Sequence, residues 1–168
     1  SRAVRAHGAV EDAAAEILAV HSAEARAETG GAELVLAGHS YGGMVAQELA
    51  LRYPEKIRSL LLVCTSAGGA GRPSFPLHEL EALAPAERVK RYLQISDTRR
   101  TDEWIVANPD HWQTLLDISL SARRPDRDEV GAMKQLNARK FHDTYERLAA
   151  LNLPVLLQGG AVSCQWIR

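Results

Sequence analysis

The segment Gly38-x-Ser40-x-Gly42 constrains the fold of this chain more than any other feature of its sequence. An apolar run, residues 34–37, comes directly before it, and apolar residues at helical spacing follow it at once. A strand, a sharp turn that carries a serine, and a helix are therefore predicted in that order. Glycine has no Cβ, so Gly38 and Gly42 would let the strand and the helix pass close together. The apolar positions of the predicted helix are Met44, Val45, Leu49 and Ala50.

The elements that follow complete a recognisable unit. Pro54 ends the predicted helix after Tyr53, and the apolar run Ser59–Cys64 predicts a second strand. A run without polar alternation indicates burial on both faces, as in a parallel sheet under two layers of helices. Strand, helix and strand within about 30 residues form a right-handed crossover unit.

With these elements in order, residues 38–63 resemble the α/β-hydrolase family. The resemblance rests on Gly-His-Ser-Tyr-Gly-Gly at residues 38–43, on the helix that stops at Tyr53-Pro54, and on the strand that follows. It implies an α/β fold, namely part of an α/β-hydrolase domain with a parallel sheet and a helical cap insertion. It also implies that Ser40 is a nucleophile at the positive end of the helix, and that the backbone N–H of Tyr41 is an oxyanion donor.

The rest of the chain is predicted to be helical, except for one more strand. A helix is expected over residues 11–28, and a loop rich in glycine and proline over residues 65–76. Leu153–Leu157 is the third predicted strand, and Phe141–Gly160 resembles the family's segment between cap and core. We expect residues 1–65 to hold the elbow part of the core, 66–148 the cap, and 149–168 a returning strand and a divergent tail. The helices expected in the cap are Leu77–Leu83, Ala86–Ser96, Thr101–Asn108, Pro109–Ser121 and Asp126–Arg139.

The resemblance stops after Gly160. In the family an acidic residue follows the strand that matches Leu153–Leu157, and the catalytic histidine follows a further strand. Residues 161–168 contain no Asp or Glu, and Ser163 stands about where the acid is expected. We therefore expect this chain to be incomplete at both ends, with the acid and the base of the triad outside it. His39 is not expected to replace them, since its side chain should point away from Ser40 into the packing behind it.

Other histidines and aromatic residues lie in or beside the predicted cap. The family's base does not come from this region, so these histidines are expected at the surface or in packing. The pair His142-Asp143 is expected to be structural, because adjacent residues rarely face each other. The aromatic side chains either line a substrate pocket or pack the cap, and packing is favoured. The residues concerned are His78, His111 and His142, and Phe75, Tyr92, Trp104, Trp112 and Phe141.

Composition limits the partners and the compartment. The formal net charge of −1 gives no electrostatic case for nucleic acid or an acidic membrane as a partner. Two distant cysteines, Cys64 and Cys164, allow no disulfide framework or zinc spacing, and a reducing compartment is expected. No apolar run approaches the roughly 18 residues of a membrane span, and the first residues show no signal-peptide pattern. A cytoplasmic protein without a metal or organic cofactor is expected.

Three functional hypotheses remain open. The first is a serine hydrolase that cleaves an ester, amide or other acyl bond of a small molecule, with peptidase, esterase, lactonase and C–C hydrolase activities all open. The second is a truncated or frameshifted product that cannot turn over. The third is a module that binds a small ligand, in which Ser40 is only a hydrogen-bond donor, because a fold does not fix a function.

Overall fold

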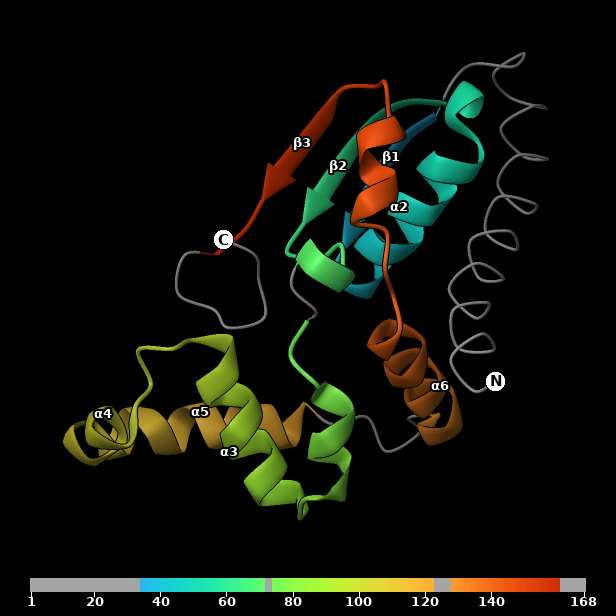
Figure 1. Cartoon of the computed structure of the whole chain (residues 1–168). Helices are drawn as coiled ribbons and strands as arrows, with labels where there is room; N and C mark the ends of the chain where they lie inside the picture. The colour runs from blue at the N-terminus through green and yellow to red at the C-terminus, as the bar shows by residue number, and fades with distance from the viewer. Residues whose placement is uncertain (1–33, 72–73, 123–127, 161–168) are drawn as a thin grey trace.

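A three-stranded parallel sheet forms the centre of the chain (Figure 1). The computed structural model describes residues 34–71, 74–122 and 128–160. The strands lie in the order β1 (Leu34–His39), β2 (Ile57–Val63) and β3 (Val155–Gln158). Helix α2 (Tyr41–Arg52) connects β1 to β2, as the crossover between parallel strands requires. The α/β fold class is confirmed, and each predicted strand is found with its ends shifted by one or two residues.

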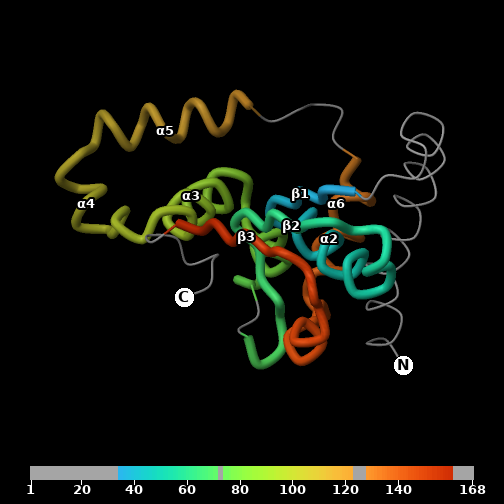
Figure 2. Tube along the Cα trace, turned by 90° about the horizontal axis from the view of Figure 1, so that it is seen from above, coloured from blue at the N-terminus to red at the C-terminus, as the bar shows by residue number. Residues whose placement is uncertain are grey.

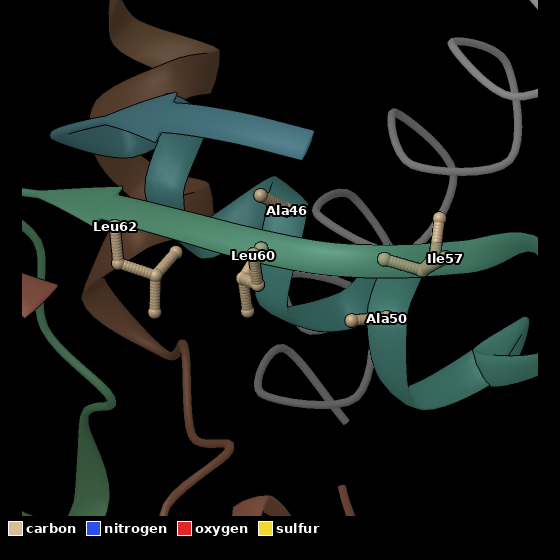
Figure 3. Close-up of a cluster of buried hydrophobic side chains, with 5 residues drawn as sticks. All are labelled: Ala46, Ala50, Ile57, Leu60 and Leu62. Carbon is tan, nitrogen blue, oxygen red and sulfur yellow. The ribbon is translucent and has the colours of Figure 1, made fainter. Parts of the chain in front are cut away.

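Helix α2 packs on the sheet through small side chains. Figure 3 shows Ala46 and Ala50 of α2 facing the apolar side chains of β2. Ala50 is fully buried, and Leu60 is only 2% exposed. Alanine at both positions lets the helix lie close to the strand, where each buried leucine contributes about 1.5–3 kcal/mol. This packing fixes the start of α2 relative to the end of β1. The β2 residues in the cluster are Ile57, Leu60 and Leu62.

The expectation that β2 is buried on both faces is wrong for the described part of the chain. Leu60 and Leu62 are buried, whereas Leu61 and Val63 between and after them are half-buried. Successive side chains of a strand point to opposite faces, and α2 covers one face of the described sheet (Figure 2). Every residue of the edge strand β3 is exposed.

The helices predicted between residues 77 and 140 are present, although the first is a 3₁₀ helix. Proline at the first position begins α3 and α5. The hydroxyl of Thr101 accepts a hydrogen bond from the Trp104 N–H at 3.2 Å and caps α4. In Figure 1, α3, α4 and α5 lie together beyond the carboxyl ends of the strands. The helices are η3 (Leu77–Ala82), α3 (Pro85–Ser96), α4 (Asp102–Ala107), α5 (Pro109–Ser121) and α6 (Glu129–Lys140).

Helix α6 and the segment after it contact the core of the described chain. Ala138 of α6 is buried against Met44, Val45 and Leu49 of α2. Asp143 then forms an isolated antiparallel bridge with Gly68. Three further short 3₁₀ helices complete the described elements, namely η1 (Pro54–Lys56), η2 (Gly69–Gly71) and η4 (Glu146–Ala150). Among the described residues, no helix combines the length and the apolar character that a membrane span requires. The helix expected over residues 11–28 lies outside the described residues.

Candidate active site

Ser40 occupies a sharp turn between the last residue of β1 and the first residue of α2. Its φ of 54° and ψ of −121° place it outside the regions that most residues adopt. Among the described residues, Cys64 is the other non-glycine residue with a positive φ, at 48°. The Ser40 N–H donates to the Val63 carbonyl at 3.0 Å. Two strained residues therefore meet at the carboxyl ends of β1 and β2, and each strained conformation costs about 1–3 kcal/mol.

Two glycines make this turn sterically feasible. A Cβ on Gly38 would lie 2.5 Å from the Gly42 carbonyl oxygen and 2.6 Å from the Gly43 Cα. A Cβ on Gly43 would lie 2.5 Å from the Thr65 Cβ. In contrast, a Cβ on Gly42 would meet no atom within 4 Å. The predicted reason for Gly38 holds, but the reason given for Gly42 applies instead to Gly43, because that residue faces the chain beyond β2.

The peptide group between Ser40 and Tyr41 is held by two hydrogen bonds. The Ser40 carbonyl oxygen accepts from the Thr65 Oγ1 at 2.8 Å and from the Gly43 N–H at 3.0 Å. The Tyr41 N–H, on the same peptide, is the first N–H of α2, and intrahelical bonding does not satisfy such groups. The positive end of the helix dipole and an N–H in this position favour an anionic oxygen.

The two residues that flank Ser40 differ in their surroundings. The Tyr41 side chain is half-buried, and burial raises the pKa of its phenol above 10, so the group is neutral at physiological pH. His39 is exposed. The expectation that His39 packs behind the turn is therefore wrong. It falls on the face of β1 that carries Val35 and Ala37, which are also exposed, because strand side chains alternate between faces.

The remaining described histidines have surroundings of their own. The His78 Nε2 lies 3.9 Å from the Glu79 carboxylate, and burial, followed by the charge of Lys140, lowers the pKa of His78. The His111 ring meets the Trp104 ring edge-on, with 5.4 Å between centroids. His78 thus approaches a carboxylate, whereas His111 packs against an aromatic ring.

The adjacent residues His142 and Asp143, expected to be structural, make separate contacts. His142 is 4% exposed, and its Nε2 lies 3.4 Å from the Thr144 Oγ1. The Asp143 Oδ1 accepts from the Tyr145 N–H at 3.2 Å. Within the described ranges, no three His, Cys, Asp or Glu residues gather as a metal site would need. Ser163 and Cys164 lie outside those ranges.

A cavity of about 450 Å³ lies among the helices η3, α3, α5 and α6. Its walls are mostly apolar, and the ion pair between Arg88 and Glu81 forms part of them, with 2.5 Å between Nη1 and Oε2. Of the five aromatic residues considered above, Tyr92 lines this cavity, whereas Trp112 is buried in packing. Ser40 does not line it, so the cavity is separate from the elbow in the described part of the chain.

Thr65 is a residue of this site that was not predicted from the sequence. A usable signal was present, because Thr65 and Ser66 are the first polar residues after an apolar strand that runs parallel to the strand before Ser40. The carboxyl ends of neighbouring parallel strands meet at one edge of a sheet, where sites in α/β folds occur.

Comparison with known proteins identifies the family. The model of the alpha/beta hydrolase fold matches residues 5–97, more than half of the chain, and the chain belongs to this family. A hydrolase from Oleispira antarctica is 16% identical with a TM-score of 0.53, and the match covers 81% of this chain and 50% of that one. The 2-hydroxy-6-oxo-6-phenylhexa-2,4-dienoate hydrolase from Rhodococcus sp. strain RHA1 is 15% identical with a TM-score of 0.49, covering 85% and 51% respectively. The chain thus spans about half the length of these structures. No curated protein sequence matches it.

Proposed function

We propose that this chain carries the nucleophile of a serine hydrolase that cleaves an ester, amide or other acyl bond of a small molecule. The observation that carries the proposal is the left-handed turn at Ser40, at the N-terminus of α2 and at the carboxyl end of β1. Such a turn exposes a serine hydroxyl above the sheet, next to backbone N–H groups. Membership of the α/β-hydrolase family supports the same assignment.

In the proposed reaction, the Ser40 Oγ attacks the substrate carbonyl carbon and a general base takes the hydroxyl proton. The carbonyl oxygen becomes an oxyanion, which accepts a hydrogen bond from the Tyr41 N–H. One such donor contributes about 2.7–4 kcal/mol to the stability of a transition state. The tetrahedral intermediate then expels the leaving group, which takes up the proton, and water releases the acyl group from Ser40.

We assign neither the general base nor its acidic partner to any of the described residues. A serine hydroxyl is a weak nucleophile without a base, and the acid holds the histidine in the required tautomer. The described histidines at 78, 111 and 142 make contacts with Glu79, Trp104 and Thr144, which support packing roles for them.

A fluorophosphonate probe tests the proposal. The purified chain should be labelled if a base within it reaches Ser40, which would overturn the expectation that the base lies outside it, and Ser40→Ala should abolish the labelling. Ser121→Ala is the matched control, because Ser121 is an exposed serine at the end of α5 whose Oγ donates to the Ile118 carbonyl at 3.0 Å. Catalysis by this chain would be contradicted if the Ser40→Ala variant were still labelled. It would also be contradicted if the folded original chain were not labelled. The latter result would favour a fragment without turnover or a ligand-binding module.

A further inference from the structure

Thr65 lies where the chain beyond β2 meets the turn at Ser40. It is two residues past Val63, the last residue of β2, and Cys64 between them has a φ of 48°, which turns the chain. Thr65 is 7% exposed. A buried hydroxyl needs a hydrogen-bond partner, and the partner of Thr65 is the Ser40 carbonyl oxygen at 2.8 Å.

The direction of this hydrogen bond has a consequence for the Tyr41 N–H. The Ser40 carbonyl and the Tyr41 N–H belong to one peptide group, which is planar and trans. Its C=O and N–H point in opposite directions, so fixing the carbonyl also fixes the N–H. A hydrogen bond to the carbonyl polarises the peptide as well, and this strengthens its N–H as a donor.

The position of Thr65 is itself determined by contacts with α2. Its side chain lies so close to Gly43 that a Cβ there would be 2.5 Å from the Thr65 Cβ and 2.6 Å from its Oγ1. The next residue is tied to the same helix, because the Gln47 Nε2 donates to the Ser66 carbonyl at 3.1 Å. Gln47 is 1% exposed and Ser66 is 1% exposed. The contact with Gly43 and the hydrogen bond from Gln47 to Ser66 thus hold this segment against α2.

We propose that Thr65 is the positioning residue of the oxyanion site, because its hydroxyl holds the Ser40–Tyr41 peptide so that the Tyr41 N–H faces the reacting carbonyl. This inference rests on the proposed function of Ser40 and Tyr41. Thr65 acts through the peptide group and takes no part in the chemistry.

Two variants of Thr65 separate the hydroxyl from the shape of the side chain. Thr65→Val removes the hydroxyl and keeps the branched side chain against Gly43, whereas Thr65→Ser keeps the hydroxyl. The rate of fluorophosphonate labelling at Ser40 should fall about 10-fold or more in Thr65→Val, somewhat less than the loss of a whole oxyanion donor. In Thr65→Ser it should stay within about 3-fold of the original rate. A merely structural residue would lower stability without this split between Val and Ser.

A second measurement does not depend on catalysis. The ¹³C resonance of the Ser40 carbonyl should move upfield in Thr65→Val, the Tyr41 amide resonance should move with it, and both should return in Thr65→Ser. If Thr65→Val does not fold, Thr65→Ala is compared with Thr65→Ser in the same way. Unchanged resonances would overturn the role of Thr65. If the original chain is not labelled, the proposed function fails, and these resonances still decide whether Thr65 holds the peptide.

Discussion

The guanidinium of Arg147 forms a two-pronged ion pair with the carboxylate of Glu48, 99 positions earlier in the chain. The Nη1 donates to Oε2 at 3.0 Å, and the Nη2 donates to Oε1. The Nη2 also donates to the Asp143 carbonyl at 2.9 Å. Glu48 is fully buried in α2, whereas 41% of the Arg147 side chain is exposed. The segment after α6 is therefore fastened to the helix that begins at the Ser40 turn.

Removing the cation of this pair should destabilise the fold. Arg147→Met leaves the buried Glu48 carboxylate without its partner. Breaking a buried pair costs about 3–5 kcal/mol, and we expect about 3 kcal/mol, because water reaches the Arg147 side. The free energy of unfolding in urea measures the loss. The double variant Glu48→Gln with Arg147→Met removes the charge as well, and it should recover part of the stability. A loss below about 1 kcal/mol would show that the pair behaves like an exposed one.

The two glycines after the turn should respond oppositely to alanine. Gly42→Ala places a Cβ in open space, and alanine in a helix is favoured over glycine by about 0.5–1 kcal/mol, so the variant should be as stable or more stable. Gly43→Ala places a Cβ 2.5 Å from the Thr65 Cβ. It should cost about 1–3 kcal/mol, as overpacking does, and weaken the hydrogen bond from Thr65 to Ser40. Urea unfolding of both variants checks the prediction, and equal stabilities would contradict it.

The order of elements around Ser40 could be predicted because local signals agree there. An apolar strand, a turn built on Gly38 and a helix stopped by Pro54 each act within a few residues. The helices between residues 77 and 140 were predicted for the same reason, since proline and capping residues mark their starts. Contacts between Gly43 and Thr65 depend on how two strands align, and no local pattern encodes this alignment.

Burial was the property that local patterns predicted least well. An apolar run in β2 indicated two covered faces, but Leu61 and Val63 are half-buried in the described structure. The burial of two polar residues in α2 was also not predicted. Gln47 and Glu48 look like surface positions, but segments 66–68 and 142–147 cover them and supply their hydrogen-bond partners. These partners are far from α2 in the sequence, so the sequence pattern of this helix alone does not predict the hydrogen bonds.

Thr144 supplies a test of that buried network. Thr144 is fully buried, and its Oγ1 lies 2.5 Å from the Gln47 Oε1 and 3.2 Å from the Ala67 carbonyl oxygen. Thr144→Val keeps the volume but leaves the buried Gln47 oxygen without this donor. The expected loss is about 1–3 kcal/mol, the cost of an unsatisfied buried acceptor. Thr144→Ser should lose less, because it keeps the hydroxyl. Thermal or urea unfolding measures the stability of the two variants. A larger loss of stability in Thr144→Ser than in Thr144→Val would contradict the proposed hydrogen bonds of Thr144.

A second ion pair, between Asp97 and Arg99, should make the free energy of unfolding depend on pH in the acidic range. Hydrogen bonds from the Arg99 side chain, at 2.9 Å to Oδ1 and 2.8 Å to Oδ2, hold the pKa of Asp97 at about 2, below its ordinary 3.8. A carboxyl whose pKa is lowered by folding adds stability that is present above its unfolded pKa and is lost as the pH falls. The contribution of Asp97 should therefore be complete above a pH of about 4 and should disappear as the pH falls through about 2.

Carbon NMR of the Asp97 carboxyl during an acid titration measures this pKa directly. Arg99→Ala should move the midpoint from about 2 toward 3.8, because the side-chain hydrogen bonds are the largest cause of the shift. At neutral pH, the Asp97→Asn variant should have a lower free energy of unfolding than the original chain. This difference in free energy should become smaller below a pH of about 4. Since 71% of the Arg99 side chain is exposed, added salt should also raise the midpoint. A midpoint near 3.8 in the unmodified chain would show that Arg99 does not hold Asp97 in solution.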